Sequence, residues 1–92
     1  MIEEFKHKGL REFFTHGITA GIINEHKRRL KMILEMLHAS ENIEDINFPG
    51  SNLHKLKGDM KEYWSIRLSG NWRIIFKFNR GKAYALDYVD YH

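Results

Sequence analysis

The chain has 92 residues, with no cysteine and one proline, and 42% of its residues are hydrophobic. This length supports one packed domain, and the lack of cysteine excludes disulfides and thiolate metal sites. The net charge is +3, but residues 53 to 92 carry eight Lys and Arg against four Asp and Glu, whereas residues 1 to 52 carry seven against eight. A basic C-terminal half favours a polyanionic partner such as nucleic acid, although a merely solvated basic face explains it equally well.

The first residues, Met1 to Phe5, lack the basic and apolar regions of a signal peptide. No apolar run approaches the roughly 20 residues that a membrane-spanning helix requires. We therefore expect a single cytoplasmic domain over residues 1 to 92 that makes no use of a membrane.

A short strand and a helix are expected first. Residues 2 to 5 are consistent with the strand. Leu10, Phe13 and Phe14 then fall at positions i, i+3 and i+4, which places them on one face of a helix. Gly17 is positioned to end this helix, because glycine readily adopts the left-handed conformation of a C-terminal cap.

A second helix is predicted from Asn24 to Ala39, with Asn24 as its N-cap. Its apolar stripe is typical of a helix packed on a core and consists of Leu30, Ile33, Leu34 and Leu37. Residues 40 to 52 are mostly polar and contain Pro49, so we expect a loop there, with one helical turn around residues 43 to 46.

Beyond Leu53 the apolar side chains recur at every second position, which predicts three antiparallel strands. The apolar members are Trp64, Ile66, Leu68, Trp72, Ile74, Phe76, Phe78, Tyr84, Leu86 and Tyr88. If all of them share one face, both hairpin loops must have an odd length, because a slip of one residue would move a whole set to the other face. Loops at residues 69 to 71 and 79 to 81 meet this condition. This register pairs Leu68 with Trp72, Arg67 with Arg73, and Arg73 with Asp87.

The opposite face of the sheet then presents Arg67, Arg73, Lys77 and Asp87, with Ser65 and Asn71 near its rim. Two arginines directly opposite each other cost a few tenths of a kcal/mol, on the order of 0.2–1, unless an anion lies between them. The planar guanidinium matches two phosphate oxygens, which favours a phosphate clamp. A functionally silent ion pair between Arg73 and Asp87 is an equally open interpretation.

Proton-transfer groups gather at the end of the chain, in Asp90, Tyr91 and His92, and His54 and Lys57 precede the hairpins. RNA cleavage without a metal needs a base for the 2′-hydroxyl, cations for the phosphoryl oxygens and an acid for the departing 5′-oxygen. The inventory fits that reaction. A loose terminus with polar side chains is the plainer alternative.

A metal site is the competing use of His54, Asp90 and His92, whose side chains are all possible ligands. The histidines lie far apart in the sequence, no H-E-x-x-H motif exists, and we expect no metal and no other cofactor. The remaining histidines lack ligand spacing and are interpreted as surface residues: His7, His16, His26 and His38.

Five segments of the chain resemble the HigB toxins of the RelE superfamily most specifically, and the resemblance extends over essentially the whole length of the chain. These are residues 2 to 10 (IEEFKHKGL), 53 to 59 (LHKLKGD), 64 to 66 (WSI), 71 to 74 (NWRI) and 88 to 92 (YVDYH). The resemblance implies an α+β fold of βααβββ order, with two N-terminal helices packed on one face of a curved, mainly antiparallel sheet. It also implies a metal-independent endoribonuclease that enters the ribosomal A site and cleaves messenger RNA there by attack of the 2′-hydroxyl.

The same resemblance implies an active site and a set of partners. The site would be lined by His54, Lys57, Asn71, Arg73, Asp90, Tyr91 and His92. Lys57 and Arg73 would hold the scissile phosphate, and either Asp90 or His92 would be the base, with the other histidine as the acid. Tyr91 would orient the RNA or stack on it. The partners would be a helix-turn-helix antitoxin of the HigA kind, the ribosome and messenger RNA.

The register argument adds Arg67 as an auxiliary phosphate contact and places Lys77 on the same basic face. Two other functions stay open. A non-catalytic nucleic-acid-binding module would bind RNA in a salt-sensitive way without cutting it. A gyrase-poisoning toxin of the same superfamily would cause DNA damage in place of translation arrest.

Overall fold

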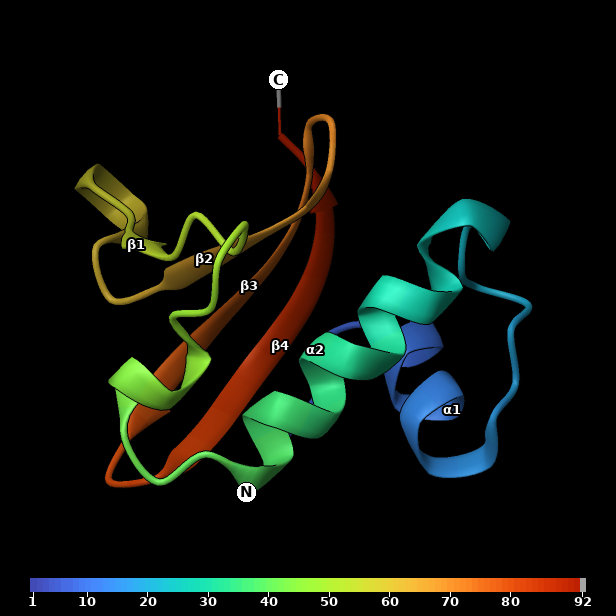
Figure 1. The fold of residues 1–92 in the computed structure, drawn as a ribbon, viewed down its shortest axis with the longest axis horizontal. Coiled ribbons are helices and arrows are strands. Elements are labelled where there is room, and N and C mark those ends of the chain that lie inside the picture. The colour runs from blue at the N-terminus through green and yellow to red at the C-terminus, as the bar shows by residue number, and fades with distance from the viewer. Residues whose placement is uncertain (92) are drawn as a thin grey trace.

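The structure, a computed structural model, describes residues 1 to 91. Its N-terminal half holds α1 (Lys8–His16), η1 (Asn24–His26), α2 (Lys27–Ala39) and η2 (Ile43–Ile46). The C-terminal half holds β1 (His54–Lys55), η3 (Gly58–Met60), β2 (Trp64–Ser69), β3 (Trp72–Asn79) and β4 (Lys82–Asp90). The strands form one antiparallel sheet in the order β1-β2-β3-β4, and both α-helices lie on one of its faces (Figure 1). The expected α+β class is confirmed.

Both helices and the sheet share one apolar core. Fully buried side chains from α2 and from three strands meet there, namely Leu30, Ile33, Leu34, Leu37, Ile66, Ile74, Phe76 and Leu86. Burial of one such side chain contributes about 1.5–3 kcal/mol, so this face holds α2 on the sheet. The apolar stripe predicted for the second helix is confirmed, and so is the helical turn at residues 43 to 46.

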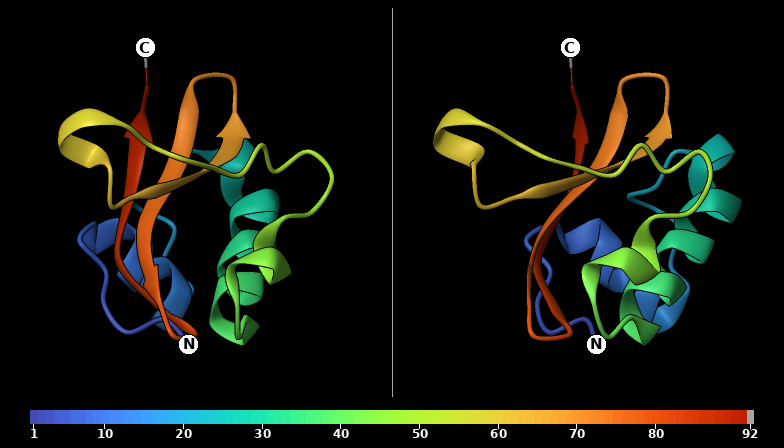
Figure 2. Two further views of the ribbon diagram at one scale, coloured as in Figure 1. Left: turned by 90° about the vertical axis from the view of Figure 1, so that its left-hand side faces the viewer. Right: turned by 60° about the vertical axis from the view of Figure 1, so that its left-hand side comes forward.

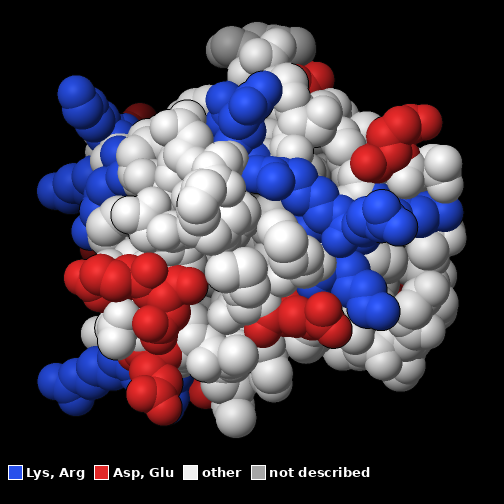
Figure 3. Space-filling model, in the orientation of Figure 1, with Lys and Arg blue, Asp and Glu red and all other residues white. Residues whose placement is uncertain are grey.

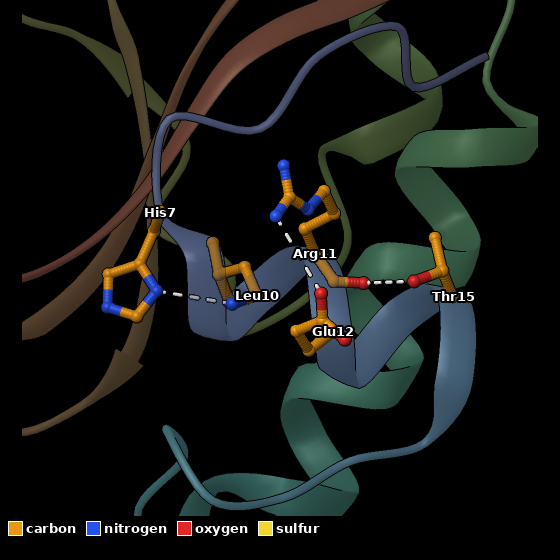
Figure 4. A network of polar contacts seen from close by, with 5 residues as sticks. All are labelled: His7, Leu10, Arg11, Glu12 and Thr15. Atoms are coloured by element: carbon orange, nitrogen blue, oxygen red, sulfur yellow. Dashed lines mark hydrogen bonds and ion pairs between the residues drawn. The ribbon is translucent and has the colours of Figure 1, made fainter.

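The ends of α1 follow local chemistry. Gly17 adopts the left-handed conformation at φ 70°; its N–H donates to the Phe13 carbonyl at 3.0 Å and the Ile18 N–H donates to the Glu12 carbonyl at 3.2 Å, as in a C-terminal cap. At the other end, Nδ1 of His7 accepts a hydrogen bond from the Leu10 N–H at 3.1 Å (Figure 4). The helix and its glycine stop are therefore confirmed. The predicted N-cap of the second helix is wrong, because Asn24 is already the first residue of η1.

The N-terminal segment does not form a strand with a continuous ladder. It makes two isolated parallel bridges to β4, between Ile2 and Ala83 and between Phe5 and Leu86. The Glu3 N–H donates to the Ala83 carbonyl at 2.8 Å, so the segment still lies along the edge of β4. The expected first strand is thus reduced to two bridges, and a short strand before η3, β1, completes the sheet at the other edge.

The first hairpin pairs Arg67 with Arg73 as predicted, but it turns more tightly than expected. Ser69 pairs with Trp72 across a two-residue turn, and the register shifts between Arg67 and Ser69. The extra residue on β2 is Leu68, which forms a β-bulge instead of pairing with Trp72. The predicted three-residue loop is therefore wrong. The pairing of Arg67 with Arg73, which was derived from that loop, is nevertheless correct.

The second hairpin also has a two-residue turn, Arg80-Gly81, and both residues have positive φ (50° and 79°), as such turns require. A bulge on β4 then shifts the register, and Ala85 takes a φ of +54° there. The bulge lets Ala83 and Leu86 both face the core, whereas Tyr84, which was predicted to be there, is only half-buried. As a consequence Arg73 pairs with Val89, and its predicted pairing with Asp87 is wrong.

Among the described residues, no helix is long and apolar enough to cross a bilayer.

Candidate active site

The face of the sheet that points away from the helices carries two neighbouring rows of side chains. Residues paired on antiparallel strands point to the same face, so the register determines which side chains share a row. One row runs from Arg67 through Arg73 to Val89. The next row contains His54, Ser65, Ile75 and Asp87. Rows two residues apart along a strand are about 7 Å from each other, so His54 lies one row from the arginines, at the edge of the sheet.

The first row brings two arginines together as strand partners, Arg67 and Arg73. Arg73 is half-buried, and its Nη1 donates to the carbonyls of Gly70 at 2.7 Å and Trp72 at 3.1 Å, which holds the group against the β2–β3 turn. Arg67 is exposed. Within residues 1 to 91 no ion pair joins either arginine to an acidic side chain. Two neighbouring guanidinium groups attract an anion that can accept hydrogen bonds from the N–H donors of both.

Asp87 does not form the ion pair with Arg73 that was one open interpretation. Its Oδ1 accepts a hydrogen bond from the backbone N–H of Tyr88 at 2.9 Å, and it lies across from Ile75 in the other row. The two-residue turn and the bulge at Ala85 are the physical reason, because each of them moves Asp87 by one place relative to β3 from the predicted register. Within residues 1 to 91, no ion pair between Asp87 and the arginine row is therefore present.

The C-terminal end of the described chain is held beside this row. β4 continues to Asp90, which pairs with Trp72, and the Tyr91 N–H donates to the Asn71 carbonyl at 2.7 Å. Figure 1 shows this end next to the turn between β2 and β3. Strand alternation puts Tyr91 on the face of Arg73 and Asp90 on the face of Trp72. His92 lies outside the described residues.

His54 has a defined tautomer in this arrangement. Its Nδ1 lies 2.8 Å from the carbonyl oxygen of Asn52. A carbonyl can only accept, so Nδ1 carries the hydrogen in this contact; in the neutral ring the lone pair is then on Nε2. The side chain is exposed, and the segment that carries it crosses the strands on the face away from the helices (Figure 2, left). Lys57 follows in the same segment, is exposed and precedes η3.

Lys77 is not brought together with the arginine row. It lies four residues along β3 from Arg73, or about 13 Å, and its ammonium is 3.4 Å from a carboxylate oxygen of Glu62. The ammonium also lies 5.3 Å from the ring centre of Tyr63, a cation–π contact. Lys77 therefore marks the far end of the basic face.

Ser65 was expected near an exposed rim, and this expectation is wrong. The residue is 1% exposed, and its Oγ has no hydrogen-bond partner among the described residues. The neighbouring Ile75 is also buried, although both residues lie on the face away from the helices. The segment from Ser51 to Leu56 runs along the outer edge of β2 next to Ser65, and the Ser51 carbonyl accepts from the Arg67 N–H at 2.8 Å. The open part of the face is the end with the two arginines.

Sequence reasoning missed His26, which was grouped with the surface histidines but is 5% exposed. Its Nδ1 lies 2.5 Å from the phenol oxygen of Tyr88, and its ring contacts those of Trp72 and Tyr88 edge to face. Burial raises the pKa of Tyr88, and the hydrogen bond from the Ile23 N–H lowers it in part. No local pattern signals this cluster, because His26 precedes the apolar stripe of α2.

Arg29 was also missed. It lies on the flank of α2, where its Nη2 donates to the carbonyls of Gly50 at 2.8 Å and Arg67 at 3.1 Å. Its guanidinium lies 5.6 Å from the ring centre of Phe48. The side chain therefore ties α2 both to β2 and to the loop that leads toward His54.

A metal site was the competing interpretation for part of these residues. No three His, Asp or Glu side chains in the described part of the chain come together in a way that suits a metal ion. His92, which was one of the three candidate ligands, lies outside the described residues.

Comparison with known proteins gives consistent matches over the whole chain. Residues 3–92 match the family described as the RelE-like toxin of the type II toxin-antitoxin system HigB. The chain is 44% identical over 92 residues to "Endoribonuclease HigB" of Proteus vulgaris, with all of both chains covered. It is 32% identical over 94 residues to "Toxin HigB-1" of Vibrio cholerae, covering 100% of this chain and 98% of the other. An uncharacterized protein of Haemophilus influenzae is 33% identical over 92 residues, with 98% and 90% covered.

Proposed function

From the premise that this chain belongs to the RelE-like HigB toxins of type II toxin-antitoxin systems, we propose that it is an endoribonuclease that cleaves messenger RNA in the ribosomal A site. One structural observation carries the proposal. Arg67 and Arg73 are strand partners, no ion pair joins either of them to a carboxylate within residues 1 to 91, and the Tyr91 N–H holds the end of the described chain on the Asn71 carbonyl beside them, whereas Asp90 lies on the face of Trp72. The printed name of the Proteus vulgaris relative supports the same reaction.

The scissile phosphate binds between the two guanidinium groups in this proposal. Each group offers a planar fork of donors to the nonbridging oxygens, and the bound phosphate removes the repulsion between Arg67 and Arg73. Positive charge there also stabilises the additional negative charge that develops on phosphorus-bound oxygens during attack. Asn71 and Lys57 contact the RNA on either side of this position, and Lys77 contacts it only away from the scissile bond.

Cleavage then requires two proton transfers and no metal. A base removes the proton of the 2′-hydroxyl, its oxygen attacks phosphorus, and the bond to the 5′-oxygen breaks as an acid protonates that oxygen. The products are a 2′,3′-cyclic phosphate and a 5′-hydroxyl. Asp90, His92 and the Nε2 of His54 are the groups proposed for these two roles. Tyr91, which is 47% exposed, offers its ring to stack on a base of the RNA.

A toxin of a type II system works with an antitoxin, and we propose that the partner here is a helix-turn-helix protein of the HigA kind. The proposed substrate complex is the translating ribosome with its messenger, which places the activity in the cytoplasm. No cofactor takes part in the proposed reaction.

The deciding experiment maps messenger ends after brief induction of the toxin in cells. The intact chain is compared with a chain that lacks His92 and with Arg73→Ala, and Arg80→Ala serves as a charge-matched control at the other end of β3. New 5′ ends in register with the reading frame, present for the intact chain and the control and absent for the two variants, are expected. Growth arrest without new ends would instead favour a non-catalytic binding module, and DNA breaks would favour a gyrase poison.

A further inference from the structure

The start of α2 carries an unusual concentration of positive charge. Lys27, Arg28, Arg29 and Lys31 lie within its first five residues, and its first turn has no acidic residue. The N-terminal end of a helix is itself the positive end of the helix dipole, so cations there are destabilising. No side chain caps this end with a hydrogen bond either. This sequence therefore opposes the local stability of α2.

Only Arg29 has an evident structural use. It donates to the Gly50 and Arg67 carbonyls and lies over Phe48. Arg28 and Lys31 are exposed, and within residues 1 to 91 no ion pair involves Lys27, Arg28 or Lys31. Packing does not explain the three remaining charges, and departures from local rules tend to occur at functional sites.

These charges are continuous with the arginine row of the sheet. Figure 3 shows a band of Lys and Arg that crosses one side of the molecule, from the end with the β2–β3 turn to the start of α2. The hydrogen bonds from Arg29 to the Arg67 carbonyl, at 3.1 and 3.3 Å, show that α2 and the end of β2 are in contact there. The band therefore extends the proposed phosphate site around the edge of the sheet onto the helix side.

We propose that Lys27, Arg28 and Lys31 form a second RNA-binding surface, which contacts the sugar–phosphate backbone of ribosomal RNA. This inference rests on the proposed function, because it names the contact that holds the toxin on the ribosome while the arginine row holds the messenger. A single strand that passes between Arg67 and Arg73 lies on the opposite face of the sheet from α2. A large folded RNA can instead present phosphates to both, and closely spaced cations without an apolar groove suit a polyphosphate surface.

The test uses the full chain with Lys27→Gln, Arg28→Gln and Lys31→Gln combined. Binding to purified ribosomes is measured by co-sedimentation from about 0.05 to about 0.3 M KCl. Each lost phosphate contact lowers the salt slope of log affinity by about 0.7–0.9, so the slope should fall by about 2. The affinity at the lowest salt concentration should fall about 100-fold or more, and the loss should shrink as the salt concentration rises. The cutting rate at saturating toxin should stay unchanged.

A matched control removes the same charge elsewhere with Lys61→Gln, Arg80→Gln and Lys82→Gln, three exposed residues. It should keep the slope of the wild type. The thermal unfolding midpoint of the α2 triple variant should be unchanged or raised, because the substitutions remove positive charges from the N-terminal end of a helix. This result would exclude misfolding as the cause of weak binding.

An unchanged slope in the α2 variant, or an equal loss in the control, overturns the inference. Unchanged ribosome binding with lost capture of the antitoxin would overturn it too, since the surface would then serve that protein. The measurement needs no cleavage, so an inactive nuclease that still shows the slope difference would refute the proposed function alone. An active nuclease without the slope difference would refute this inference alone.

Discussion

Nδ1 of His26 lies 2.5 Å from the phenol oxygen of Tyr88, which joins the turn before α2 to the last part of β4. The same oxygen accepts a hydrogen bond from the Ile23 N–H at 3.3 Å. Trp72, whose strand partner is Asp90, packs on both rings, with ring centres 4.8 Å from Tyr88 and 5.6 Å from His26. The buried pair therefore supports the strand ends on which the proposed active site is built.

Replacement Tyr88→Phe should lower the free energy of unfolding by about 1–3 kcal/mol. The change leaves the His26 ring nitrogen and the Ile23 N–H without their partner in a buried place, and an unsatisfied buried group costs about that much. Urea unfolding at neutral pH measures it. Tyr84→Phe, at a half-buried residue of the same strand, is the control and should stay within about 0.5 kcal/mol of wild type.

The raised pKa of Tyr88 predicts a loss of stability in alkali. Its ordinary value is 10.0, and burial, the larger cause, moves it up in the folded chain. From about pH 10 upward the unfolded chain releases this proton more readily than the folded chain, so the free energy of unfolding falls as pH rises through that range. Urea unfolding between about pH 9 and about pH 11 should show the fall, and Tyr88→Phe should show less of it. Identical slopes for the two proteins would contradict the assignment.

Replacement Arg29→Met should destabilise the fold by about 1.5–3 kcal/mol, the range for hydrogen bonds made by a charged donor. The variant loses the bonds to the Gly50 and Arg67 carbonyls, which tie α2 to β2 and to the loop before β1. Arg28→Met removes the same charge from an exposed neighbour and should change stability by no more than about 0.5 kcal/mol. Chemical denaturation of the two variants compares them directly, and equal effects would show that charge alone matters.

The bulge on β4 predicts opposite effects for two substitutions of Ala85. Its φ of +54° costs a residue with a side chain roughly 1–2 kcal/mol. Ala85→Gly should therefore be neutral or raise stability by up to about 1 kcal/mol, even though glycine also loses more entropy on folding. Ala85→Val should lower stability by about 1 kcal/mol or more, because a β-branched residue tolerates this conformation poorly. Thermal unfolding of both variants distinguishes the bulge from a regular strand, in which valine would be preferred.

The arginine row makes a prediction about activity. Arg73→Ala should reduce cutting of ribosome-bound messenger by about 100-fold or more, since a preorganised charge at the reacting phosphate is removed. Arg73→Lys should restore only part of it, because an ammonium lacks the planar fork. Single-turnover cleavage followed by primer extension gives the rates, and the unfolding midpoint checks that the fold persists. If Arg73→Ala cleaves at the wild-type rate, the arginine row has no part in the mechanism.

Local spacing in the chain was enough to locate most of the elements. Gly17 ends α1, the stripe from Leu30 to Leu37 packs on the sheet, and alternation identified β2, β3 and β4. The Arg67–Arg73 pair also followed from the demand that large apolar side chains share one face. These features depend on neighbours within a few residues, or on the single condition that the large apolar side chains share one face. The sequence is therefore sufficient to predict them.

The register of β4 and the exposure of single residues could not be read in this way. One extra residue at Leu68 and another at Ala85 shift the pairing. The second, together with the two-residue turn before β4, places Asp87 beside Ile75 and away from Arg73. Ser65 and His26 are buried by segments that lie far from them in the chain. A bulge costs little locally, and its position is decided by which side chains of β4 fill the core under the helices.

The sequence by itself determined the order and type of the two α-helices and of β2, β3 and β4, the excess of basic residues in the C-terminal half and the chemical groups available there, because these follow from composition and periodicity. Only the tertiary structure decided which of those groups share a row, because β4 aligns on β3 by packing Ala83, Leu86 and Tyr88 against the core. That packing leaves Arg73 next to Arg67 and Val89, away from any carboxylate partner within residues 1 to 91, which is the arrangement on which the proposed phosphate site rests.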